Sequence, residues 1–190
     1  LVGSEMCIRD RFLSEVKKYR YWAMYDFIVS FYLPFSYGIY LDLLSKNLLA
    51  GYFLIRLLLE ALAKHYLADV KYPSHLLSEQ KVALLESDFS EKKSISELMK
   101  KLDEILKPEN NCKELWKELS SKWIHPVKKL TGNRLNKKQT SWPLIIPEPY
   151  TENDLNDVFE FKKILSQFRK ISCKAIENWK NFVLSEKLST

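Results

Sequence analysis

His125 is the residue of this chain whose type and position best suit acid–base chemistry. It follows the helical pattern of residues 119–124 and precedes Pro126, so we expect it at a helix C-terminus. The negative end of the helix dipole favours a protonated imidazole there, and such a histidine can exchange a proton with a ribose hydroxyl near neutral pH. The simpler interpretation is a histidine that only caps the helix, and the residue taken alone favours that structural role.

A run of basic residues surrounds this histidine. Residues 122–138 contain six basic side chains and no acidic one. They are Lys122, Lys128, Lys129, Arg134, Lys137 and Lys138. Positive charge concentrated in this way, with Trp123 and Trp142 able to stack on bases, is typical of a site for a phosphate-rich partner such as RNA. The alternative is a solvated lysine-rich loop.

Cysteine and histidine spacing predicts no metal site and no cofactor. Cys112 and Cys173 are isolated, and the chain contains neither a CxxC nor an HExxH motif. Two isolated thiols are typical of a reducing compartment, so we expect a cytoplasmic protein. A single disulfide between these two cysteines is the alternative.

The composition predicts one all-α domain that positions these residues. Only four of 190 residues are glycine, which argues against a glycine-rich nucleotide fold and a turn-rich β-sandwich. Apolar residues make up 46% of the chain, enough for a core. Apolar steps of three and four predict an up-and-down bundle of about five to seven helices with an irregular basic loop at 126–150. The expected helices are 11–32, 36–46, 48–69, 75–87, 94–106, 111–124 and 151–186.

Prolines and capping residues set several of these boundaries. Pro34 is expected to interrupt the first helix, because proline lacks an N–H and its ring clashes with the preceding turn. Asn111 is expected to cap the helix that carries Trp116. Thr151 and Asp154 have the spacing of a capping box and are expected to open the longest helix.

Arg56 and Glu60 lie one turn apart in the apolar helix 48–69 and should pair, because an unpaired charge there would be costly. We expect a structural ion pair; the alternative is a pair that orients a neighbouring histidine. His65 lies about 180° around the same helix from Arg56, so these two residues do not form one site.

The last helix carries a heptad seam. Its members are Val158, Phe161, Leu165, Phe168, Ser172, Ala175, Trp179 and Phe182. Such a seam can pack against the chain's own helices or form a dimer. We expect the first, because the other apolar helices must find partners within the fold.

Residues 27–41 carry no charge, which raises the possibility of a membrane span. This stretch includes Pro34, and the next apolar stretch includes Arg56 and Glu60. A spanning helix needs about 20 apolar residues and tolerates central charges poorly. We therefore expect buried helices and no membrane partner, and a membrane-surface role for residues 27–46 is the weakest alternative.

Residues 1–10 match the translated end of a transposase-type sequencing adapter. The codons ctc-gtg-ggc-tcg-gag-atg-tgt-ata-aga-gac spell Leu1 to Asp10 without a gap. We expect these residues to be an artefact and the domain to comprise residues 11–190; the alternative is a natural N-terminus. Residues 11–190 carry 29 basic and 22 acidic side chains, so the basic run holds nearly all of the surplus of +7.

Three segments together resemble the HEPN superfamily: LLAGYFLIRLLLEALAKHYLAD, LWKELSSKWIHP and the long terminal helix. The resemblance covers residues 12–186 in the order of the elements. It implies a helical bundle, frequent dimerisation, and membership of a toxin–antitoxin or antiviral defence system. Active members are metal-independent ribonucleases, with a motif of Arg, a polar residue, three variable residues and His.

On this sequence the resemblance gives His125 the histidine position, Ser121 the polar position and Ser120 the arginine position. Serine cannot stabilise the phosphorane charge as the arginine does. Either Lys122 or Arg56 supplies the cation, or the domain binds RNA or a partner without cleavage. We therefore predict a HEPN-like protein that engages RNA with weak or no ribonuclease activity. The alternative is a non-catalytic helical module that forms a homodimer or binds a cognate partner protein.

Overall fold

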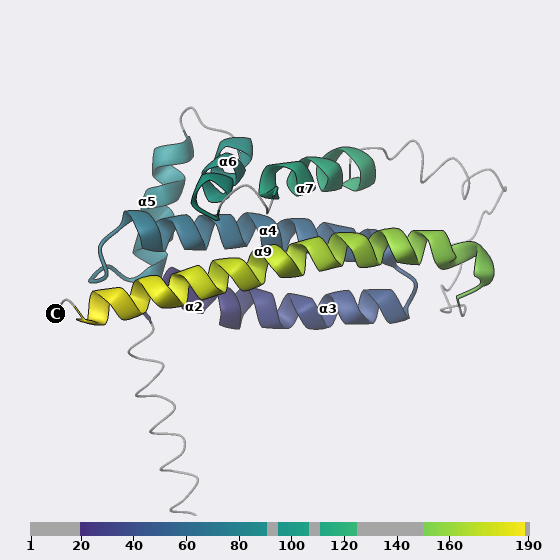
Figure 1. The fold of residues 1–190 in the computed structure, drawn as a ribbon, viewed down its shortest axis with the longest axis horizontal. Coiled ribbons are helices and arrows are strands. Elements are labelled where there is room, and N and C mark those ends of the chain that lie inside the picture. Colours follow the sequence, from purple (N-terminus) through teal and green to yellow (C-terminus); the bar gives the residue numbers. More distant parts are fainter. Residues whose placement is uncertain (1–19, 91–94, 107–110, 125–149, 189–190) are drawn as a thin grey trace, which may run out of the picture.

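The computed structural model describes residues 20–90, 95–106, 111–124 and 150–188, which form helices joined by short turns and contain no strand (Figure 1). The elements in chain order are α2 (Ala23–Asp26), η1 (Phe27–Tyr32), α3 (Leu33–Leu44), α4 (Leu48–Lys71), α5 (Ser78–Ser90), α6 (Ile95–Leu106), α7 (Cys112–Glu118), η2 (Leu119–Ile124), η3 (Glu152–Asp154) and α9 (Leu155–Leu188). The prediction of an all-α bundle with a long C-terminal helix is confirmed.

Helix α4 is the centre of the bundle. It packs against α3, α5, α6 and α9, and Figure 1 shows it between the layer of α2 and α3 and the layer of α6 and α7. Ile55, Leu58 and Leu62 are completely buried, as expected for a helix that is apolar around most of its circumference. Gly51 allows α9 to approach closely, because a Cβ atom there would lie 2.8 Å from the ring of Phe161.

Residues 23–44 form one continuous helical rod, so the prediction that Pro34 interrupts the first helix is wrong. The segment η1, which ends at Tyr32 two residues before Pro34, is π-helical. Its wider turn accommodates the missing N–H and the ring of the proline. The backbone of Tyr32 is still helical, with φ −62° and ψ −49°, so the chain passes from η1 into α3 without a break.

A buried polar cluster joins four helices. Asp69 of α4 and Lys81 of α5 are both fully buried, with Nζ 3.0 Å from Oδ1. The Asp69 carboxylate also accepts hydrogen bonds from the backbone N–H groups of Ala23 and Met24, each at 2.9 Å, and from Nε1 of Trp179 at 3.0 Å. A negative charge at the first N–H groups of α2 stabilises that helix end. This cluster was not predicted from the sequence.

The heptad seam of α9 packs inside the bundle, as predicted. Five of its eight members are buried, and the other three are partly buried. Helix α9 packs against α4, α6 and α7. A dimer formed through this seam would have to displace the chain's own helices.

The predicted capping box at the start of α9 is confirmed. Oδ2 of Asp154 accepts hydrogen bonds from the N–H and the hydroxyl of Thr151, both at 2.8 Å. Lys46, with Nζ 2.6 Å from Oδ2, and these two bonds lower the pKa of Asp154 to about 2. The carboxylate therefore stays charged above about pH 2 and ties the start of α9 to the turn between α3 and α4.

The predicted cap of α7 is wrong. Asn111 makes no side-chain capping bond, and its backbone is left-handed, with φ 36°. Instead Asp103 of α6 accepts hydrogen bonds from the N–H groups of Cys112 at 2.6 Å and Lys113 at 3.0 Å. A carboxylate from the preceding helix thus replaces the local cap.

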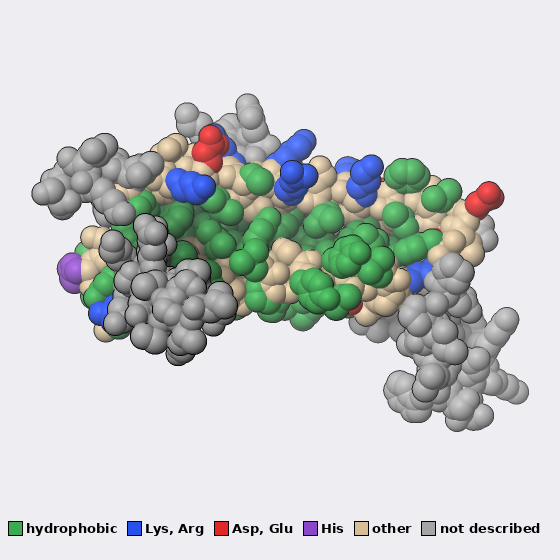
Figure 2. Space-filling model, turned by 90° about the horizontal axis from the view of Figure 1, so that it is seen from below, with side chains coloured by type: hydrophobic (Ala, Val, Ile, Leu, Met, Phe, Trp, Pro, Cys, Tyr) green, Lys and Arg blue, Asp and Glu red, His purple; other side chains and the backbone are tan. Residues whose placement is uncertain are grey.

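The outer side of the rod 23–44 is exposed and apolar, which corrects the expectation that this stretch is buried. Tyr37 is the most exposed large hydrophobic side chain of the rod, at 64% exposed. Only 11% of the rod's most apolar 18-residue window is buried. Among the described helices, only the rod is long enough and apolar enough to cross a membrane, judged by length and composition. Figure 2 shows hydrophobic side chains gathered across this face. The expectation of burial holds for α4 but not for the rod.

Candidate functional site

The structure describes two residues of the predicted motif, Ser120 and Ser121, both on η2. Lys122 lies on the same segment, but its side chain is outside the described part of the chain. The remaining predicted site residues outside it are His125, Lys128, Lys129, Arg134, Lys137 and Lys138.

The two serine hydroxyls bond to the preceding helical turn. Oγ of Ser120 donates to the carbonyl of Trp116 and Oγ of Ser121 to that of Lys117, both at 2.7 Å. Such back-bonds are common for serine within helices. Ser120 is 8% exposed, whereas Ser121 is at the surface. The position that the resemblance gives to arginine is therefore buried, and the polar position faces outward.

Arg56 and Glu60 form the predicted ion pair, which is partly buried. Nε of Arg56 lies 2.9 Å from Oε1 of Glu60, and the side chains are 19% and 16% exposed. The indole Nε1 of Trp116 donates to the same oxygen at 2.7 Å, and the Arg56 guanidinium lies 5.5 Å from the centre of the indole ring. Trp116 was not predicted from the sequence; it joins the pair to α7 and makes it a three-residue cluster.

One member of this cluster, Trp116, lies one helical turn before Ser120. Trp116 and Ser120 are four residues apart on a continuous helix, so they share a face, and η2 packs against α4. Arg56 therefore approaches η2, the segment that carries Ser120 and Ser121, from α4. Its Nε bonds to Glu60, which fixes the plane of the guanidinium, and its terminal nitrogens are the atoms suited to a phosphate oxygen.

Replacing Glu60 with alanine should lower the free energy of unfolding by about 1–2 kcal/mol, because the indole N–H and the guanidinium both lose their partner. Residual solvent contact keeps the cost below that of a fully buried pair. Urea unfolding followed by circular dichroism measures it. The matched control is Glu104→Ala, which removes an exposed i,i+4 pair with Lys100 and should cost less than about 0.5 kcal/mol. An equally small cost for Glu60→Ala would contradict the prediction.

His65 lies on the opposite side of α4 from Arg56, as the helical spacing predicted. Its ring is 5.9 Å from that of Phe27 and 5.2 Å from that of Phe31, and Nδ1 donates to the carbonyl of Ala61 at 2.7 Å. Burial lowers the pKa of His65, so its ring is neutral at pH 7. His65 is therefore a core residue and shares no contact with the Arg56 cluster.

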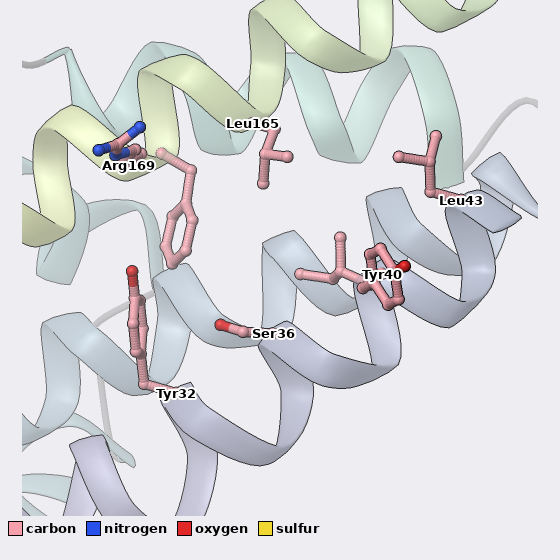
Figure 3. Close-up of a pocket in the computed structure, with 8 residues that line it drawn as sticks. Tyr32, Ser36, Tyr40, Leu43, Leu165 and Arg169 are labelled. Atoms are coloured by element: carbon pink, nitrogen blue, oxygen red, sulfur yellow. The ribbon is translucent and has the colours of Figure 1, made fainter.

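A second candidate feature is an apolar groove of about 260 Å³ between the rod and α9. Figure 3 shows Tyr32 and Arg169 at one end and Tyr40 and Leu43 at the other. The lining residues are Tyr32, Ser36, Ile39, Tyr40, Leu43, Leu165, Phe168 and Arg169. A groove with apolar walls and one cation at its end suits a hydrocarbon chain better than a nucleotide.

The described residues contain no group of three or more His, Cys, Asp or Glu side chains that could hold a metal ion. Cys112 and Cys173 are both free thiols, so they do not form the alternative disulfide. The chain is thus an all-α bundle in which an Arg–Glu–Trp cluster packs beside a π-helical segment. Comparisons with protein-family models, curated proteins and solved structures give no match to this chain.

Proposed function

We propose that this chain is a HEPN-like protein of a toxin–antitoxin or antiviral defence system that engages RNA at the end of η2. His125 and the basic residues of 122–138 contact the RNA, and ribonuclease activity is weak or absent. The observation that carries this proposal is the position of Arg56, on the helix that packs against the motif segment.

Arg56 bears on the departure of this chain from the family motif. Ser120 stands where the motif has arginine, and its buried hydroxyl bonds to the preceding turn. A cation that supports the chemistry must then come from another element. The Arg56 guanidinium is cationic and is held by Glu60 and by Trp116, which itself lies one turn before Ser120. The ion pair with Glu60 partly neutralises it, which supports weak rather than efficient cleavage.

Any cleavage of single-stranded RNA in EDTA should fall at least about 100-fold in His125→Ala, because a general acid or base is removed. RNA affinity should change less than about threefold, since one side chain among many contacts is lost. The matched control is His75→Ala, which removes an exposed histidine before α5 and should change neither quantity. Cleavage that persists in His125→Ala, or that requires a metal ion, would contradict the proposal.

Arg56→Gln tests the cation separately. A glutamine amide can still donate to Glu60, so the cluster keeps a hydrogen bond while losing its positive charge. We expect cleavage to fall about tenfold or more with little loss of stability. Unchanged cleavage in a folded Arg56→Gln variant would assign the cation to another residue.

The alternative function is a non-catalytic interaction module. The heptad seam of α9, one surface that such a module could use, packs within the bundle. The exposed apolar side of the rod 23–44 is open to a partner.

A further inference from the structure

The outer side of the rod 23–44 is a large apolar surface that no described element covers. We call it the apolar face, and its most exposed members are Val29, Leu33, Tyr37, Tyr40, Leu41 and Leu44, each 46–64% exposed. Large exposed apolar patches on a folded protein usually mark interaction sites.

The apolar face is uncharged over most of its length. No charged residue occurs between Asp26 and Asp42, whereas the outward side of a soluble surface helix normally carries charges. The inward side is packed against the bundle: Ile39 is 5% exposed, and a Cβ atom at Gly38 would lie 3.1 Å from the side chain of Leu54. The rod therefore lies flat on the bundle, which is the geometry of a helix at a membrane surface rather than across a membrane.

A stripe of cations borders the apolar face. Lys162, Arg169 and Lys180 are all exposed on α9. Their spacings of seven and eleven residues are close to two and three full turns, so they lie on one side of that helix. Arg169 lines the groove beside Tyr32, which shows that this side faces the rod. Figure 2 shows Lys and Arg side chains in a row along one edge of the apolar face.

We propose that the apolar face docks on the surface of an anionic lipid bilayer. Its aliphatic side chains and tyrosine rings enter the boundary between headgroups and acyl chains, and the cationic stripe meets lipid phosphates. The groove between them receives part of one acyl chain, with Arg169 at its end.

Charge complementarity favours a bilayer over a second copy of the chain. The cationic stripe attracts negative charge, and residues 27–41 of a second copy carry no acidic side chain to pair with it. An anionic bilayer supplies apolar depth and negative charge together. This inference does not depend on RNA binding, because it uses a different surface from the Arg56 cluster.

Vesicle co-sedimentation of the full chain tests the proposal, with vesicles of 70% phosphatidylcholine and 30% phosphatidylserine compared with phosphatidylcholine alone. We expect the parent to prefer the anionic vesicles at least about tenfold, because each cation near the surface adds to the attraction. Leu33→Glu with Leu41→Glu should weaken binding to them at least about tenfold, through the cost of placing charge in the boundary region. Lys162→Gln, Arg169→Gln and Lys180→Gln together should abolish the preference for phosphatidylserine.

Matched controls keep composition and charge equal. Leu84→Glu with Ile105→Glu places the same charges at exposed apolar positions of α5 and α6 and should leave binding unchanged. Lys163→Gln, Lys170→Gln and Lys174→Gln remove the same charge from positions turned about 100° around α9 and should retain the preference. Tyr37→Ser with Tyr40→Ser is a milder face variant at exposed positions. It should bind at least about fivefold less at an unchanged melting temperature.

Three results would overturn the proposal. One is a parent that ignores anionic vesicles, or face variants that bind as their controls do. Another is a dimer that Leu33→Glu dissociates, with no vesicle binding, which would assign the apolar face to a second copy. The third is resistance of bound protein to alkaline carbonate, which would indicate a helix that spans the bilayer.

Discussion

Asp69→Ala is expected to lower the free energy of unfolding by about 3–5 kcal/mol. The variant leaves Lys81 fully buried without its counter-charge, which is more costly than losing an exposed pair. It also removes the acceptor of two backbone N–H groups at the start of α2 and of the Trp179 indole.

Urea unfolding with a double-variant cycle measures this effect. Adding Lys81→Met to Asp69→Ala should recover part of the lost stability, because the stranded charge is removed while the apolar stem keeps its packing. The control is Glu86→Ala, which breaks an exposed pair with Lys64 between the same two helices and should cost less than about 0.5 kcal/mol. A loss below about 1 kcal/mol for Asp69→Ala, or no recovery in the double variant, would contradict the prediction.

Replacing Lys128, Lys129, Lys137 and Lys138 with glutamine is expected to weaken RNA binding by about two to three orders of magnitude near 0.1 M salt. Each phosphate contact to a single strand contributes about 0.7 to the slope of log affinity against log salt, so four lost contacts should reduce the slope by about 2.8. The loss should be similar for unrelated sequences, because phosphate contacts carry little sequence information.

Fluorescence anisotropy with two unrelated single-stranded RNAs at several salt concentrations measures both quantities. The matched control replaces four exposed lysines of α6 and α9, namely Lys100, Lys163, Lys170 and Lys174, and so changes the net charge equally. It should weaken binding much less. If both variants bind alike, the attraction comes from overall charge; if the first variant binds as the parent does, the RNA proposal fails.

The helices of this fold were predictable because each buries a continuous apolar stripe that appears in the sequence as steps of three and four. The predicted break of the first helix at Pro34 was wrong because a π-helical turn accommodates the proline. Exposure of the rod could not be predicted either: periodicity identifies an apolar helix but does not show whether its outer side is covered. The ion pair of Asp69 and Lys81 could not be predicted, because the two residues lie on different helices and become partners only after these helices pack.

Only part of the candidate site was predictable from the sequence. The four-residue spacing of Arg56 and Glu60 on one helix predicts their ion pair. Trp116 lies 56 residues further along the chain from Glu60, and no local pattern links them. The spacing of Trp116 and Ser120 was the available signal, since it places the indole on the same face as the motif residue.

The hydrogen bonds to Asp69 are also expected to form in a definite order during folding. Its bond to Lys81 joins residues 12 apart, those to α2 span 45 and 46 residues, and the bond to Trp179 spans 110. Loop-closure entropy grows with the separation of the joined residues, so the hairpin of α4 and α5 is expected to form first. The N-terminal end of the rod then docks on a carboxylate already held by Lys81, and α9 closes over it last. The surface that meets solvent longest during folding is the one that α9 finally covers.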